Sequence, residues 1–217
     1  MNELLRDGKV RIGSWLSPGL VSEVIAGSEC DWILIDGELS PNDVLIDMAQ
    51  LQAAGKMPVE TFVRLPSNDA SVIKQIMDIG ARSQMIPNVR CTDQAREIVR
   101  TTHHAPDGIR NFSEGHRSNR FGRITVDQAN AAGGQLLVLQ IGWAESAKGA
   151  AEIAAAEGVN VLFVGLADRL TILGAMGIPG TAQVPSRSPY QGVLHAGGCR
   201  SGPGASGAWL GFFDEHH

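Results

Sequence analysis

Six short apolar runs alternate with stretches of helical spacing along the chain as far as Val164. Runs that stay apolar over most of their length are typical of strands buried on both faces, which occur in parallel sheets. The predicted strands cover residues 10–16, 31–36, 60–64, 81–86, 136–141 and 159–164. The predicted helices cover residues 18–27, 41–54, 69–79, 92–102 and 145–157. This order predicts an α/β protein with a parallel sheet, and both a doubly wound sheet and a (β/α) barrel fit it.

Two stretches interrupt the pattern. A long polar segment runs from His103 to about Gly134. After about Gly180, Gly, Ser, Pro and Arg dominate, and no helical or strand period continues. This composition predicts a loose tail over 181–217 after a folded domain over 1–180. Within the tail, the weak apolar runs 192–194 and 208–213 are compatible with packing against other residues. The abrupt change favours the hypothesis of a shifted reading frame or a truncated gene.

The overall composition excludes several classes of protein. The 217 residues are 43% hydrophobic, enough for one sizeable core, and a net charge of −5 argues against a nucleic-acid binder. No apolar run is long enough for a membrane span, and the first residues lack the apolar core of a signal peptide, so a cytoplasmic location is expected. The three cysteines, Cys30, Cys91 and Cys199, lack the spacing of a zinc site.

In a parallel barrel the chemistry lies at the carboxyl ends of the strands. The predicted strand ends provide Asp36 and Glu38, Arg64, Gln140, and the turn 165–168. A guanidinium, several carboxylates and an amide suit a small anionic substrate and a divalent metal bound through oxygen. Each residue alone also has an ordinary structural interpretation, for example as a helix cap or a turn.

Six motifs along the chain, taken together, are more specific than any single residue. They are GSWLS (13–17), DWILIDGE (31–38), FVRLP (62–66), IKQIMDIGA (73–81), GIR (108–110) and VGLAD (164–168). In order and spacing they resemble the HpcH/HpaI family, which includes 4-hydroxy-2-oxoheptanedioate and 2-dehydro-3-deoxyglucarate aldolases. The resemblance covers roughly residues 5–180.

The resemblance implies a TIM-type (β/α) barrel of eight units, of which about six are recognisable here, and a homo-oligomer, often a hexamer. It also implies a divalent cation (Mg, Mn or Co) held by a Glu and an Asp, with pyruvate and an aldehyde as the reaction partners. A cation of this kind acts as a Lewis acid for the pyruvate enolate. In the family an Arg stabilises the developing charge, and a His moves the proton.

Transferred to matching positions, the family's roles fall on five residues of this chain. Arg64 matches the stabilising arginine, and Asp78 matches the aspartate that makes the catalytic histidine more basic. Gln140 and Ala167 match substrate contacts. Asp168 matches both a substrate contact and a metal ligand.

The chain departs from the family at two site positions. Leu39 stands where the family has the catalytic histidine, and none of the six histidines is an obvious replacement. Gly142 stands where the family has its metal-binding glutamate, which predicts weakened metal binding. Glu145 lies close by, but its position predicts an acidic residue in the first turn of a helix.

Three functions therefore stay open at this point. The first is reversible cleavage of a 4-hydroxy-2-oxo acid to pyruvate and an aldehyde. The second is an impaired or inactive homologue that binds 2-oxo acids or partner subunits, which Leu39 and Gly142 favour. The third is a related lyase, or another enolate chemistry, that does not need the histidine.

Overall fold

The fold is taken from a computed structural model, which describes residues 11–16, 25–27, 30–131, 136–165, 192–195 and 209–213. The strands are β1 (Arg11–Leu16), β2 (Trp32–Asp36), β3 (Glu60–Arg64), β4 (Ser83–Ile86), β5 (Leu136–Ile141), β6 (Val161–Gly165), β7 (Gly192–His195) and β8 (Trp209–Phe213). The helices are α3 (Val44–Ala54), α4 (Ala70–Asp78), α5 (Thr92–Thr102), the 3-10 helix η1 (Arg117–Asn119), α6 (Val126–Ala131), α7 (Ala144–Lys148) and α8 (Ala150–Ala154). Most of the predicted helix 18–27 lies outside the described residues.

The sheet is a closed ring in the order β1-β2-β3-β4-β5-β6-β8-β7. Strands β1 to β6 are parallel neighbours in chain order, which confirms the six predicted parallel strands of a TIM-type barrel. The last two places are filled differently. Strand β8 is parallel to β6, whereas β7 is antiparallel to both β8 and β1.

The prediction that the strand pattern ends near Gly180 is therefore wrong for two short segments. Both strands coincide with the two weak apolar runs. They fill the two places of the sheet between β6 and β1, and no described helix separates them along the chain. Closure leaves no open sheet edge in this ring, which removes a site for edge-to-edge aggregation. The barrel is incomplete as a set of eight βα units, because only six such strands are present among the described residues.

Alternation along the strands separates two cores. One set of side chains fills the barrel interior: Trp15, Trp32, Leu34, Phe62, Met85, Leu136, Val138, Val161 and Phe163. The other set, which includes Ile33, Ile35 and Val63, packs between the outside of the barrel and the helices. Gly13 makes the interior packing possible, since a Cβ at this residue would lie 2.0 Å from the Trp32 ring.

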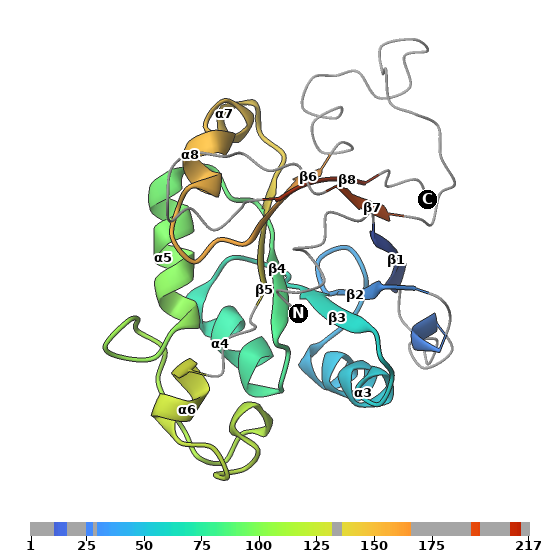
Figure 1. The fold of residues 1–217 in the computed structure, drawn as a ribbon, viewed down its shortest axis with the longest axis vertical. Coiled ribbons are helices and arrows are strands. Elements are labelled where there is room, and N and C mark those ends of the chain that lie inside the picture. Colours follow the sequence, from blue (N-terminus) through green and yellow to red (C-terminus); the bar gives the residue numbers. More distant parts are fainter. Residues whose placement is uncertain are drawn as a thin grey trace.

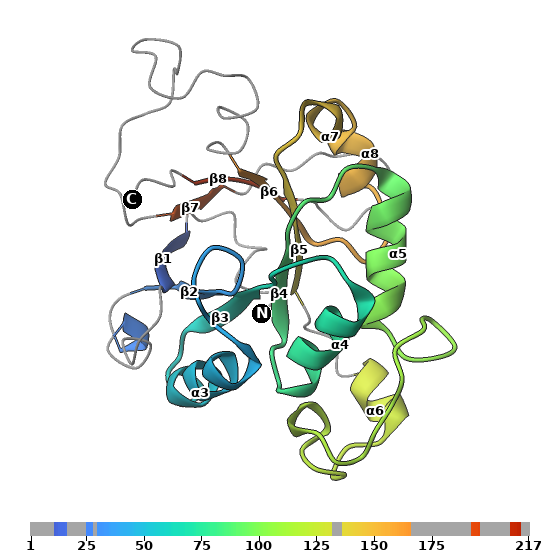
Figure 2. The same ribbon diagram turned by 180° about the vertical axis from the view of Figure 1, so that it is seen from behind.

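Helices α3, α4, α5 and α8 cover the outside of the sheet from β2 to β6 (Figure 1 and, from behind, Figure 2). Helix α3 begins later than predicted. It starts at Val44 rather than at residue 41, because its N-cap is Asp43, whose carboxylate accepts from the backbone N–H groups of Leu45 and Ile46. A carboxylate at this position satisfies backbone donors that the helix cannot satisfy itself.

The segment after α5 is more ordered than its polar composition predicts. It contains η1 and α6, which lie below α4 and α5 in Figure 1. The predicted helix over 145–157 is two short helices, α7 and α8, which meet at Gly149. Among the described residues, no helix has the length and apolar character needed to cross a membrane.

Candidate active site

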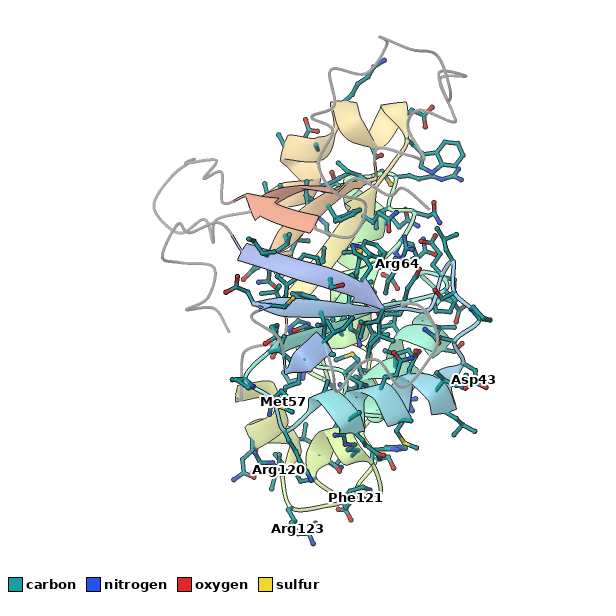
Figure 3. All side chains as sticks on the ribbon, turned by 90° about the vertical axis from the view of Figure 1, so that its right-hand side faces the viewer. Asp43, Met57, Arg64, Arg120, Phe121 and Arg123 are labelled. Atoms are coloured by element: carbon teal, nitrogen blue, oxygen red, sulfur yellow. The ribbon has the colours of Figure 1, made fainter. Side chains whose placement is uncertain are left out.

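Arg64 is a buried charged residue inside the barrel, at the end where the parallel strands finish. It is the last residue of β3, it pairs in register with Asp36 of β2, and only 1% of it is exposed. Nε and Nη2 donate to the two carboxylate oxygens of Asp36, each at 2.8 Å. Nη1 lies 3.0 Å from Oε2 of Glu38, and the guanidinium carbon lies 4.3 Å from the ring centroid of Trp15. Figure 3 shows Arg64 among the strands, in the middle of the molecule.

Asp36 is held in its ionised form by these contacts. Burial alone raises the pKa of this carboxyl, but the hydrogen bonds and charge of Arg64, with the backbone N–H groups of Glu38 and Leu39, lower the pKa below its usual value. A buried bidentate ion pair of this kind is costly to break, because either partner alone is an uncompensated buried charge. Asp36 therefore fixes the orientation of the Arg64 guanidinium.

Glu38 and Leu39 form the rim above this pair. The second carboxylate oxygen of Glu38 accepts from Nδ2 of Asn88, a residue with φ of 59° in the loop after β4. Leu39 is 61% exposed, and its backbone N–H points to Oδ1 of Asp36. The side chain next to the acid pair thus has no atom that accepts a proton.

Gln140 lies at the same end of the interior. It is on β5, in register with Phe163 of β6, and it is 2% exposed. The backbone carbonyl of Gln140 accepts a hydrogen bond from the backbone N–H of Val89, which ties the loop after β4 to β5. The structure therefore brings Arg64 and Gln140 to the carboxyl ends of their strands, as predicted from the sequence, while their roles remain predictions.

The residues expected to hold a metal are not assembled in the described part of the chain. Ala167 and Asp168 lie outside the described residues. Gly142 offers no side chain, and Glu145 is an exposed residue in the first turn of α7. No group of three or more His, Cys, Asp or Glu side chains able to hold a metal occurs among the described residues. Asp36 and Glu38 are already bonded to Arg64, so neither of them replaces the glutamate that the family has at the position of Gly142.

Asp78 lies at the other end of the barrel. Helix α4 follows the carboxyl end of β3 and leads back to the start of β4, so its last residue is at the amino ends of the strands. The carboxylate accepts from Nζ of Lys74 at 2.6 Å and from Nη2 of Arg110 at 2.7 Å. Burial opposes ionisation, yet these two cations lower the pKa of Asp78 below its usual value. Within this chain, Asp78 and Arg64 are not brought together.

A histidine does stand beside Asp78. Nε2 of His116 lies 3.6 Å from Oδ2 of Asp78, a proximity that the sequence spacing did not reveal. The pair is at the amino ends of the strands, away from Leu39. His116 therefore does not replace the missing histidine within one chain, and the catalytic role of Asp78 remains a prediction.

Asp47 is a buried acid that the sequence did not single out. It lies on α3 with 2% exposure, and among the described residues its Oδ1 has no hydrogen-bond partner. Burial, with the charges of Asp43 and Asp36, raises the pKa of Asp47 to about 6. Like-charge neighbours and desolvation both favour the protonated carboxyl.

Replacing Asp47 with asparagine is expected to stabilise the protein at high pH. A folded-state pKa of about 6 against 3.8 means that the native state binds the proton more tightly, so ionisation above about pH 6 costs up to about 3 kcal/mol. The gain should be largest near pH 8 and should disappear by about pH 3, where both folded and unfolded carboxyls are mostly protonated. Urea unfolding at several pH values measures it. The exposed Asp107→Asn variant is the control, and an equal pH dependence in both variants would contradict the assignment.

Comparisons with known proteins agree with this barrel. The family model described as HpcH/HpaI aldolase/citrate lyase matches residues 15–198. A 4-hydroxy-2-oxo-heptane-1,7-dioate aldolase from Escherichia coli is 40% identical over 179 residues, which cover 81% of this chain and 68% of the relative. A hydroxypyruvate/pyruvate aldolase from Chromohalobacter salexigens is 36% identical over 200 residues, 90% of this chain and 79% of that protein.

The fold is also shared with solved structures. A HpcH/HpaI aldolase/citrate lyase family protein from Burkholderia cenocepacia superposes with a TM-score of 0.75 at 36% identity, over 81% of this chain and 72% of that one. Macrophomate synthase shows the same fold, with a TM-score of 0.70 over 86% of this chain. By its sequence and its fold, this chain belongs to the HpcH/HpaI aldolase/citrate lyase family.

Proposed function

We propose that this chain binds pyruvate and related 2-oxo acids and cleaves 4-hydroxy-2-oxo acids to pyruvate and an aldehyde only slowly. Membership of the family and the aldolase names of its relatives support the reaction class. The low rate rests on one observation. The position beside the Arg64–Asp36 pair holds Leu39, an exposed side chain without a proton-accepting atom.

The cleavage itself shows what is missing. The C4 hydroxyl must lose its proton as the C3–C4 bond breaks, the aldehyde leaves, and the electron pair stays on C3 as the pyruvate enolate. The enolate then takes a proton at C3 to give pyruvate. A positioned base typically contributes about 10²–10⁴-fold to such a step. With Leu39 in place, water must remove the proton, and the rate falls accordingly.

Arg64 is expected to bind the anionic end of the substrate. Asp36 contacts Arg64 through both carboxylate oxygens, and the Asp36 side chain is 9% exposed. Glu38 contacts Nη1 of Arg64, and the Glu38 side chain is 17% exposed. The substrate carboxylate should therefore displace Glu38 from Nη1 and leave Asp36 in place. Gln140, buried at the same end of the barrel, is the amide we propose for a second contact.

The resemblance adds further proposals about cofactor and assembly. A divalent cation at this site would depend on Asp168, and with Gly142 as its neighbour we expect weak binding. A cytoplasmic location and a homo-oligomer also remain proposals. The second candidate function, a homologue that only binds 2-oxo acids or partners, is favoured by the same two positions, Leu39 and Gly142.

Assay of the purified full chain separates the two candidates. With manganese, pyruvate and glycolaldehyde, we expect saturable pyruvate binding by NMR and aldol formation at least about 10²-fold slower than in a family member with histidine at the matching position. Binding without measurable product would support the binding-only alternative. Product formation at an ordinary enzymatic rate, or no binding of pyruvate, would contradict the proposal.

A further inference from the structure

A second pocket lies at the amino ends of the strands, opposite the candidate active site. Its volume is about 370 Å³, which is in the range of small-molecule sites. It is enclosed by the carboxyl ends of α4 and α5, the starts of β4, β5 and β6, and the segment 103–124. In parallel barrels most catalytic residues lie at the other end, so within one chain this pocket is apart from Arg64, although Asp78, with its predicted catalytic role, is among the lining residues.

The lining of the pocket is strongly cationic. Its charged side chains are four arginines and one carboxylate: Arg82, Arg110, Arg117, Arg120 and Asp78. Asp78 is already neutralised by Lys74 and Arg110. The carboxyl ends of the two helices add about half a negative charge each. Four guanidinium groups exceed these charges, so the pocket attracts anions.

Arg110 provides the buried anchor. Its side chain is 5% exposed, and Nη2 donates to Oδ1 of Asp78 and, at 3.4 Å, to Oγ of Ser118. Among the described residues, Nε of Arg110 has no hydrogen-bond partner. A buried donor left unsatisfied costs free energy, and an oxyanion in the pocket would satisfy this one.

The three other arginines differ in how freely their side chains can contact a ligand. Nη1 of Arg117 donates to the carbonyl of Ile79 and so caps the end of α4. Arg82 and Arg120 are exposed at the rim, with no ion pair of their guanidinium groups in the described structure. Arg82 and Arg120 are therefore free to follow a ligand that Arg110 anchors.

The turn that carries Arg120 is strained. Arg120 and Phe121 have φ values of 54° and 56°, in the left-handed region that residues with side chains rarely adopt. The Cβ atom of such a residue lies close to the following carbonyl oxygen, and strain of this kind clusters at ligand-binding segments. Figure 3 shows Arg120 and Phe121 together at the lower end of the molecule, well away from Arg64.

We propose that this pocket binds a small molecule with a doubly charged oxyanion group, either a phosphate ester or a dicarboxylate. Arg110 binds the oxyanion from inside the pocket through Nε, and Arg82 and Arg120 close on it from the rim. A guanidinium fork matches the geometry of both oxyanion types. Within one chain the site lies apart from Arg64, and anion binding there can be measured without the aldolase reaction proposed above.

Calorimetric titration of the full chain with inorganic phosphate and with malonate, at constant ionic strength, tests this. We expect saturable binding of at least one anion, and each of Arg110→Gln and Arg120→Gln should weaken it about tenfold or more. Arg96→Gln removes an exposed arginine of α5 that does not line the pocket, and should leave the affinity unchanged. Tighter binding of phosphate indicates a phosphate ester, and tighter binding of malonate indicates a dicarboxylate.

Arg110→Gln leaves Asp78 with one cation fewer, so this variant could fail to fold. Arg120→Gln and Arg82→Gln then decide the question, because both side chains are exposed. Binding of neither anion overturns the proposal. So does binding that the rim variants leave intact, which would place the anion at Arg64 or elsewhere.

Discussion

Replacing Arg64 with methionine is expected to lower the free energy of unfolding by about 3–5 kcal/mol, the usual cost of removing one partner of a buried ion pair. The guanidinium is 1% exposed and makes two hydrogen bonds of 2.8 Å to Asp36. Methionine keeps much of the packing volume but leaves the Asp36 carboxylate buried without its cation. Urea unfolding followed by circular dichroism measures the change.

Three variants show whether the ion pair is responsible. Arg96→Met removes an exposed arginine paired with Asp93, so it should change stability by well under 1 kcal/mol. The double variant Arg64→Met with Asp36→Asn should recover part of the loss, because the buried charge is gone. The stability of Arg64→Lys should lie between those of the unmodified chain and Arg64→Met, since lysine keeps the charge but not the two parallel hydrogen bonds. If Arg64→Met lowers the free energy of unfolding by less than about 1 kcal/mol, the buried Asp36 carboxylate does not need the Arg64 cation.

The six parallel strands β1 to β6 could be predicted because each is recognisable from its own short stretch of sequence. Continuous apolar runs such as 136–141 identify strands buried on both faces, and the predicted bounds of β3, α5 and β5 agree with the structure. Strands β7 and β8 could not be predicted in the same way. They are four and five residues long within a Gly-rich tail, and their pairing with β1 and β6 depends on contacts far apart in sequence.

The site shows the same division between local and long-range information. Arg64 and Gln140 could be chosen as site candidates from the sequence because they lie at the carboxyl ends of recognisable strands. The bidentate contact between Arg64 and Asp36 depends on strand register, and the Trp15 ring over the guanidinium depends on barrel curvature. The start of α3 was misplaced because Ser40 and Asp43 are both good caps, and the sequence offers no way to choose between them.

The distribution of polar residues divides the barrel into two ends. At the carboxyl ends of the strands, Asp36 and Glu38 engage the guanidinium of Arg64. In the pocket at the amino ends, the single acid of the lining, Asp78, faces four arginines. The carboxyl ends of the strands thus carry Arg64 and Gln140 at positions that match the family, whereas Leu39 provides no base, and a single substitution at Leu39 can test this difference.

Introducing histidine at Leu39 is expected to raise the rate at which pyruvate exchanges its C3 protons with deuterium by about 10²-fold or more, the contribution of a positioned base. The position is 61% exposed beside the acid pair, so an imidazole fits without repacking the core. The rate should rise with pH through the ordinary histidine pKa of about 6.5, a dependence that the unmodified chain lacks. Proton NMR of pyruvate in deuterium oxide measures both.

The matched control is Leu45→His, which places the same side chain at another exposed leucine, 69% exposed in the first turn of α3. It should leave the exchange rate unchanged, because it lies outside the Arg64 site. Adding Gly142→Glu to Leu39→His should raise the rate further in the presence of manganese, since it restores the second acid that the family has there. If Leu39→His folds and binds pyruvate but gains neither rate nor pH dependence, the missing base is not what limits this chain, and the barrel closed by β7 and β8 becomes the limiting difference from its relatives.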